Sequence, residues 1–310
     1  MALKDRIPFG ISLPHRSPEP IDMSAVRQVA ERAEALGFRD LWVTENTIDH
    51  VFCFDPIVVL TYAAAVTSRI RLGASVIVLP VHHPIHVAHQ WACLDYASGG
   101  RAILGVGLGR DPHYAEFGVP RERRIRRFRE GVELIRALWN EPKVTYRGQT
   151  YGLEGGTMAP KPVQRPTLPI WMGVGHPDAV RRTAALADGW MGSGGSSKAE
   201  FARSVPILRE ALEKAGRDPA SFPVSKRVFL SVHERADTAR TELLRWFTEV
   251  YRNPPGTDAS GIHGTPEQVA EQIEALIEQG ANHLLLNPVC RYTEQVEALA
   301  AVTGLTQTAA

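Results

Sequence analysis

Glycines and a histidine that follow one apolar segment form the motif best suited to bind an anion. The sequence from Gly173 to Asp178 reads GVGHPD and precedes a segment that we expect to be helical. Backbone N–H groups at the beginning of a helix have no helical partner and can bind a phosphate group. We therefore predict a phosphate at Val174, Gly175 and His176. The alternative is an ordinary strand-to-helix turn that uses glycine for its backbone angles.

A second glycine-rich stretch gives a weaker signal of the same kind. The sequence GVGLG covers 105–109, at the end of another apolar segment. Glycine allows a flat ligand to approach the backbone closely, so we expect Gly107, Leu108 and Gly109 to line a cofactor site. The stretch is not a P-loop, because no Gly-Lys-Ser or Gly-Lys-Thr follows it.

Side chains that can transfer a proton or contact a polar substrate follow the ends of several apolar segments. The candidates are His15, Glu45, Asn46, His50, Arg110 and His113. Histidine and glutamate are common general acids and bases in enzymes. The chain contains no GxSxG or HExxH motif and no context typical of a nucleophilic cysteine, so these mechanisms are not indicated.

Two clusters of polar residues are expected to have no catalytic role. His82, His83, His86 and His89 suggest a metal site, but Pro84 interrupts them and no Asp, Glu or Cys completes a ligand set. We therefore predict no metal. The arginine-rich run 121–129 is interleaved with glutamates, which favours a solvated helix face. Its alternative role is contact with the anionic tail of a cofactor.

The segment 71–79 is expected to be a strand buried on both faces, as in a parallel sheet. Its residues Gly73, Ala74 and Ser75 are unusually small for such a strand. Small residues inside a strand often mark a bulge or the close approach of a ligand. The alternative is a plain core strand with a small-residue patch.

The elements that position these residues follow a regular order of strand and helix. Strands are predicted at 9–13, 40–44, 71–79, 101–106, 168–172, 189–191, 225–232 and 283–287. Helices are predicted at 23–36, 55–68, 84–96, 123–139, 177–187, 198–215, 236–251, 265–279 and 294–302. This alternation is typical of a parallel sheet built from βα units.

Eight such units predict an α/β fold, a (β/α)8 TIM barrel that forms one domain over 1–310. An insertion rich in proline and glycine, 140–166, lies between the fourth helix and the fifth strand, and 253–264 forms a second long loop. A doubly wound sheet is the alternative, but no GxGxxG follows the first strand. In a barrel the carboxyl ends of the strands carry the active site, where all the candidates above would lie.

Composition limits the class of partner and compartment. The 35 Lys and Arg residues nearly balance 34 Asp and Glu, which gives a net charge of +1 and no basic surface for nucleic acid or membrane. Cys53, Cys93 and Cys290 are widely spaced and form no disulfide framework. With no apolar run long enough to span a bilayer, these features favour a cytoplasmic protein that acts on a small molecule.

Several motifs together resemble the bacterial luciferase-like monooxygenase family, and most closely its branch that uses the deazaflavin coenzyme F420. They read DLWVTEN, TSRIRLGASVIVLPVHHP, LDYASGGRAILGVGLGR, FGVP, PKPVQRPTLPIWMGVG and ADGW, and they extend from about Phe9 to Pro288. The resemblance implies a (β/α)8 barrel that binds FMN or F420 at the carboxyl ends of its strands. It also implies a homodimer.

The resemblance assigns roles to particular residues. It implies a non-prolyl cis peptide bond between Ser75 and Val76, in a bulge that backs the deazaflavin ring. It places the cofactor phosphate on the turn 174–176, and Glu45 against the deazaflavin. The sugar-phosphate dehydrogenases of this branch have histidine and glutamate where this chain has Asn46 and Arg110, which argues against glucose 6-phosphate as the substrate.

The expected activity is therefore hydride transfer between F420 and a small organic substrate, in which the cofactor carries the hydride and the protein positions the reactants. An FMN-dependent monooxygenase that uses molecular oxygen is the alternative. A flavin-binding or structural barrel without catalytic activity is a third possibility, which the cluster of polar residues at the strand ends disfavours.

Overall fold

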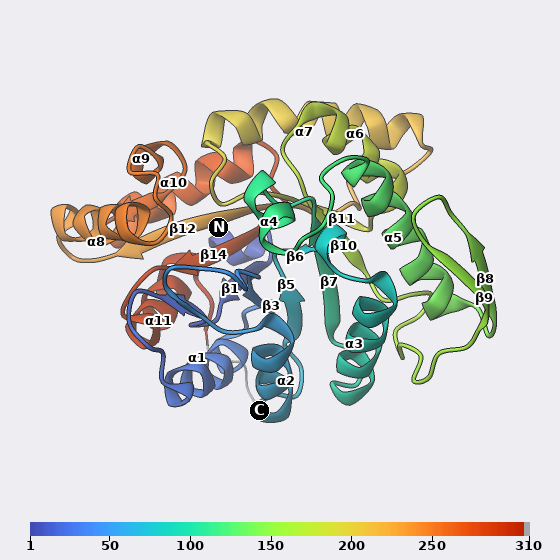
Figure 1. Cartoon of the computed structure of the whole chain (residues 1–310). Coiled ribbons are helices and arrows are strands. Elements are labelled where there is room, and N and C mark those ends of the chain that lie inside the picture. Colours follow the sequence, from blue (N-terminus) through green and yellow to red (C-terminus); the bar gives the residue numbers. More distant parts are fainter. Residues whose placement is uncertain (307–310) are drawn as a thin grey trace.

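Eight parallel strands close into a barrel in the computed structural model, which describes residues 1–306 (Figure 1). They are β1 (Phe9–Ser12), β3 (Asp40–Val43), β5 (Arg71–Ala74), β7 (Ala102–Gly107), β10 (Ile170–Gly173), β11 (Gly189–Gly192), β12 (Val224–Val232) and β14 (His283–Pro288). The pairing of β10 with β7 closes the circle, so the predicted TIM barrel is confirmed. Residues 307–310, the end of the predicted domain, lie outside the described residues.

Long helices surround the barrel and agree with the prediction to within a few residues (Figure 1). They are α1 (Met23–Leu36), α2 (Pro56–Val66), α3 (Pro84–Ala97), α5 (Arg124–Asn140), α6 (Pro177–Leu186), α7 (Lys198–Lys214), α8 (Ala236–Glu249), α10 (Pro266–Glu278) and α11 (Tyr292–Thr303). The carboxylates of Asp22 and Asp55 accept backbone N–H groups in the first turns of α1 and α2. Ser197 and Thr265 form capping boxes at the beginnings of α7 and α10.

The third strand differs from the prediction, because it is interrupted. In place of one strand over 71–79, the chain forms β5 and then β6 (Ile77–Val78), with a cis peptide bond between Ser75 and Val76. The predicted bulge and cis bond are therefore confirmed. Glycines of the neighbouring strand make room for it: a Cβ on Gly105 would lie 1.7 Å from the Ala74 carbonyl oxygen, and one on Gly107 would lie 2.6 Å from Val76.

Below the bulge the barrel is filled by side chains. The buried cluster in its centre consists of Trp42, Ile103, Trp171, Met191 and Leu285. The rings of Trp42 and Trp171 have centroids 5.3 Å apart. The Trp42 ring leaves no room for a side chain at Gly73, because a Cβ there would lie 2.5 Å from the ring. The interior is thus a packed core, and a ligand reaches the bulge from the carboxyl ends of the strands.

Several short elements lie in the loops. β2 (Arg16–Ser17) pairs with β4 (Phe52–Cys53), η1 covers Leu3–Asp5 and η2 covers Leu79–Val81. In the insertion, β8 (Val144–Arg147) and β9 (Gly152–Gly156) form a hairpin beside α5. The stretch 253–264, predicted to be a loop, contains α9 (Gly256–Ala259) and β13 (Ile262–Gly264), which pairs with β12.

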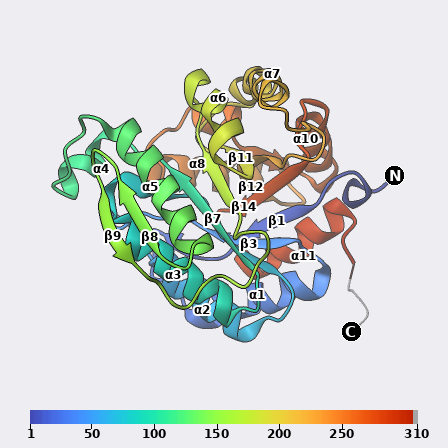
Figure 2. The same cartoon turned by 90° about the vertical axis from the view of Figure 1, so that its right-hand side faces the viewer.

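A short helix that the sequence did not predict, α4 (Asp111–Glu116), follows β7. Figure 2 shows α4 and the amino terminus of the chain on opposite sides of the barrel. Within residues 1–306, no helix combines the length and apolar character needed to cross a lipid bilayer.

Candidate active site

Glu45, two residues after the end of β3, holds the segment that follows the bulge. Its Oε2 atom accepts the backbone N–H of Val78 at 2.6 Å, and its Oε1 atom accepts a hydrogen bond from Nε2 of His82 at 2.5 Å. The carboxylate is nearly inaccessible to solvent. The predicted site residue Glu45 thus lies against the bulge. His82 is a site residue that the sequence did not reveal, because it was grouped only with the histidines of a discounted metal site.

His113 lies in α4, which begins at Asp111 with Arg110 as its N-cap, and the charge of Glu45 acts on its ring. Its Nδ1 atom accepts the backbone N–H of Arg110 at 3.1 Å, so the proton of the neutral ring is on Nε2. Burial and the charge of Arg110 lower the pKa of His113, whereas the charges of Glu116 and Glu45 act in the opposite direction. The lowered pKa favours the neutral imidazole of His113, which has its donor at Nε2. The side chain of Arg110 itself is exposed.

His15 joins the ends of β1 and β3. Its Nδ1 atom donates to the carbonyl oxygen of Leu13 at 2.7 Å, and its Nε2 atom accepts the backbone N–H of Thr44 at 3.0 Å. Burial is the main cause that lowers the pKa of His15 to about 3. Asn46 donates to the Thr44 hydroxyl oxygen at 3.0 Å, so it belongs to the same network. His15 is a fixed neutral ring at the barrel mouth.

His50 has contacts of a different kind. Its Nε2 atom donates to the carbonyl oxygen of Glu249 at 2.7 Å, at the end of α8, and Nδ1 lies 2.9 Å from the carboxylate of Asp49. The other oxygen of Asp49 pairs with Arg16 at 2.7 Å in a largely buried ion pair. His50 therefore connects the loop after β3 to α8, and these contacts do not join it to Glu45 or His113.

A second residue that the sequence did not reveal is Arg227, on β12. Its Nε and Nη2 atoms donate to Oδ1 of Asn287 at 3.0 and 2.8 Å, and Nη1 donates to the carbonyl oxygen of Ser75 at 3.2 Å. Burial lowers the pKa of Arg227 to about 10, so the side chain is still a cation at neutral pH. A charged residue in the centre of an apolar strand is the signal that could have identified it.

The predicted anion-binding turn lies between β10 and α6. His176 is the N-cap of α6, and its Nδ1 atom accepts the backbone N–H of Asp178 at 3.3 Å. A Cβ on Gly175 would meet no atom within 4 Å. Val174 and Gly175 line a hollow of about 360 Å³ that also contacts Arg203 of α7. Open backbone, a helix N-terminus and a nearby cation fit a phosphate group.

The barrel mouth also fits a flat ring. By the strand registers, the interior positions near the carboxyl ends include Ser12, Thr44, Ser75, Gly107, Gly173 and Asn287. These residues are small or polar, in contrast to the tryptophans of the layer below, whereas Phe229 of β12, in register with Asn287, is bulky. Small and polar residues around the Ser75–Val76 bulge suit the ring of the flavin-type cofactor that the resemblance implies.

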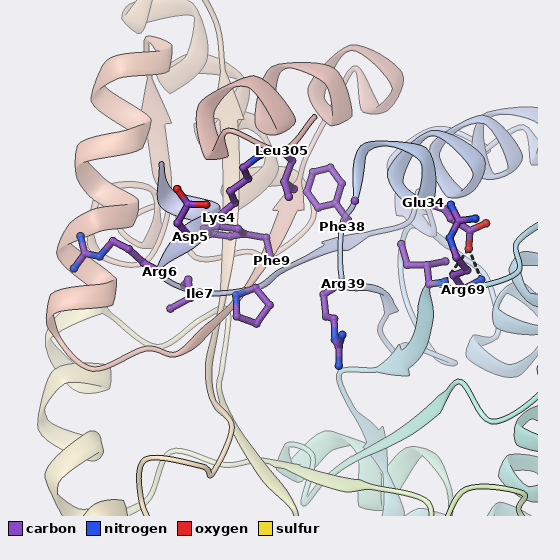
Figure 3. Close-up of a pocket in the computed structure, with 13 residues that line it drawn as sticks. Lys4, Asp5, Arg6, Ile7, Phe9, Glu34, Phe38, Arg39, Arg69 and Leu305 are labelled. Carbon is purple, nitrogen blue, oxygen red and sulfur yellow. Dashed lines mark hydrogen bonds between the residues drawn. The ribbon is translucent and has the colours of Figure 1, made fainter. Parts of the chain in front are cut away.

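A different hollow of about 550 Å³ opens at the amino ends of the strands, and Figure 3 shows Arg39 between Lys4 and the Glu34–Arg69 contact there. None of the site residues predicted from the sequence lines it. The amino end of a TIM barrel does not carry its active site, so this hollow is separate from the chemistry. Among residues 1–306, no group of three His, Cys, Asp or Glu side chains is arranged to hold a metal ion.

Comparisons with known proteins show relatives in sequence and in fold. The F420-dependent glucose-6-phosphate dehydrogenase of Kineococcus radiotolerans is 30% identical over 297 residues, which cover 93% of this chain and 85% of the relative. The F420-dependent tetrahydromethanopterin reductase of Methanopyrus kandleri superposes with a TM-score of 0.81 at 22% identity and covers 95% of this chain and 97% of its own.

An FMN enzyme shares the fold as well. The oxygenating constituent of 3,6-diketocamphane monooxygenase from Pseudomonas putida, in complex with FMN, gives a TM-score of 0.77 at 17% identity, with 99% of this chain and 98% of its own covered. At these identities the solved structures show the fold alone. The model of the luciferase-like monooxygenase family, however, matches residues 7–283. The chain therefore belongs to the luciferase-like monooxygenase family, as an oxidoreductase that uses a flavin or deazaflavin cofactor.

Proposed function

We propose that this protein is an F420-dependent oxidoreductase that acts on a small organic substrate. The observation that carries the choice of F420 is a hollow of about 230 Å³ between α5 and α6, which shares Val174 with the phosphate turn. Its lining includes Arg126, Arg129 and Arg182. F420 carries an anionic lactyl-glutamyl tail that FMN lacks, and a cationic hollow next to the phosphate site fits that tail.

The cations of this hollow are weakly compensated. Arg126 donates a hydrogen bond to the neutral amide of Gln149, and Arg129 lies 3.5 Å from Glu133 in an exposed pair. Exposed pairs of this kind contribute only about 0–1 kcal/mol, so they compete little with a ligand. The arginine-rich run therefore combines the two roles considered from the sequence: a solvated helix face with one edge turned to a cofactor tail.

In the proposed reaction F420 carries the hydride. The residues of the chain position the cofactor and the substrate and supply the proton. The Ser75–Val76 bulge supports the ring, Glu45 holds the bulge through Val78 and His82, and the turn 174–176 binds the phosphate. Nε2 of His113 carries the proton of the neutral ring and is the group that we assign to proton exchange with the substrate.

Glucose 6-phosphate is not the substrate that we propose, although a relative acts on it. The positions that carry histidine and glutamate in such dehydrogenases are Asn46 and Arg110 here. Asn46 is bound to the Thr44 hydroxyl, and the Arg110 side chain is exposed. Neither side chain can replace an imidazole or a carboxylate in acid–base chemistry.

Expression in an F420-producing host tests the cofactor directly. The expected result is a chromophore with the absorbance and fluorescence of F420 that co-purifies with the protein and is released on denaturation. Co-purification of FMN instead would favour the monooxygenase alternative, for which the same phosphate turn and the Ser75–Val76 bulge would serve.

A homodimer is part of the proposal through the family resemblance. Val58 on α2 is 58% exposed and available for such a contact. Light scattering tests the oligomeric state.

A further inference from the structure

Arg227 is a half-buried charge inside the barrel that has no counter-charge among residues 1–306. Its protein partners, the Asn287 amide oxygen and the Ser75 carbonyl oxygen, are both neutral. In the part of the chain that the structure describes, no carboxylate lies within 4.0 Å of its guanidinium. The side chain is only partly exposed, and an unpaired, half-buried cation is typical of a site whose ligand supplies the opposite charge.

The neighbouring cations show that this arrangement is particular to Arg227. Arg16, also at the barrel mouth, is paired with Asp49 at 2.7 Å. Lys226, the preceding residue, is surrounded by the carbonyl oxygens of Ser193 and Ser196, and burial lowers its pKa to about 7, so it can lose its charge. An arginine cannot do so near neutral pH.

The guanidinium also has hydrogen-bonding capacity to spare. Arginine carries five N–H donors. Three of them make the bonds to Asn287 and Ser75, through Nε, Nη2 and Nη1. One N–H on each terminal nitrogen therefore has no partner among residues 1–306. The Phe229 ring, with its centroid 4.6 Å from the guanidinium carbon, covers one face, so the donors are confined to the plane of the group.

The contact with Ser75 fixes where this charge acts. Ser75 contributes its carbonyl to the cis peptide bond of the bulge, 3.2 Å from Nη1 of Arg227. In the proposed function this bulge supports the cofactor ring. A ring that receives a hydride gains two electrons and one proton, and it becomes one charge unit more negative until a second proton binds.

We propose that Arg227 is the counter-charge for the reduced, anionic form of the cofactor ring, so that it favours the reduced over the oxidised cofactor and sets the redox potential of the bound ring. This inference rests on the proposed function. The other source of a negative charge, a carboxylate of the substrate, would leave the affinity for both forms of the cofactor unchanged when Arg227 is replaced.

The test measures the affinity of the whole protein for oxidised and for chemically reduced F420, without any substrate. In Arg227→Met the dissociation constant of reduced F420 should rise about tenfold relative to that of oxidised F420. For a two-electron couple, this ratio corresponds to a midpoint potential of the bound cofactor that is about 30 mV lower. Arg227→Lys keeps the charge and should restore most of the wild-type ratio.

A control variant separates this effect from a general effect of removing an arginine. Arg27→Met removes an arginine of α1 whose side chain is exposed and should change neither affinity. An equal loss of affinity for both redox forms in Arg227→Met, or a ratio equal to that of the wild type, would overturn the proposal. If the wild-type protein binds FMN and not F420, the proposed function fails, and the same ratio measured with oxidised and reduced FMN still decides the role of Arg227.

Discussion

Two histidines at the barrel mouth show how the surroundings of a residue decide its chemistry. His15 has both ring nitrogens bound to backbone, through Leu13 and Thr44, and is buried. Among residues 1–306, His113 has a hydrogen bond only at Nδ1, from the N–H of Arg110. Both were predicted as candidates because they follow strand ends. Of the two rings, only that of His113 keeps an N–H without a partner in the described part of the chain, which makes it the better candidate for proton transfer.

His15 should make the protein less stable in acid. Its pKa is about 3 in the folded state against an ordinary value of 6.5, so between these values the unfolded state binds one more proton and acidification favours unfolding. Protonation of this histidine in the unfolded state should lower the free energy of unfolding by about 2 kcal/mol between pH 7 and pH 5. Urea unfolding of wild type and His15→Gln at both pH values measures it. The variant should lose correspondingly less stability between pH 7 and pH 5; the same loss in both proteins would refute the assignment.

The pKa of His113 should respond to its charged neighbours with opposite signs. Arg110→Gln removes a cation that lowers this pKa and should raise it, while Glu116→Gln removes an anion that raises it and should lower it. An NMR titration of the ring resonances measures both changes. The backbone N–H of residue 110 is unaltered, so the ring keeps its hydrogen bond. Shifts of the same sign in the two variants would contradict the placement of α4.

At the scale of elements, the eight strands and their helices could be predicted, because buried strands and amphipathic helices repeat at fixed spacing. The six residues of α4, Asp111–Glu116, carry no such repeat, and the helix depends on contacts that only the folded chain provides. The pairing of Glu45 with His82 likewise requires the bulge, which turns the chain after β5. The segment 225–232 could be predicted as a strand, but the prediction did not identify Arg227 as a site residue.

The turn between β10 and α6 should bind the cofactor phosphate through its backbone. Gly175→Val places a side chain where a Cβ now meets nothing within 4 Å, so the fold should be retained while the N–H groups are blocked. The affinity for F420 should fall at least about tenfold, which is about 1.4 kcal/mol. Gly152→Val, in the hairpin of the insertion, is the matched control, since a Cβ there meets only one atom, at 3.9 Å. If Gly175→Val bound F420 with unchanged affinity, the cofactor phosphate would not bind at this turn.

For the whole molecule, a net charge of +1 conceals a local arrangement of cations. The arginines of α5 and α6 gather beside the phosphate turn, on the rim of the barrel that carries the bulge. This arrangement could be anticipated only in part, because the sequence shows the run 121–129 but not Arg182, which α6 brings to the same hollow. The family and the barrel limit the cofactor to a flavin type. F420 and FMN differ in the anionic tail, which would lie at this rim.

The direct test of F420 dependence is to titrate F420 and FMN into the apoprotein by fluorescence at low and at high salt. F420 should bind more tightly, and its advantage should shrink as salt screens the exposed arginines. The double variant Arg126→Gln/Arg182→Gln should reduce the affinity for F420 but not for FMN. Arg147→Gln, an exposed charge of the hairpin, should change neither. FMN that binds at least as tightly as F420 at low salt would contradict the account and favour the monooxygenase alternative.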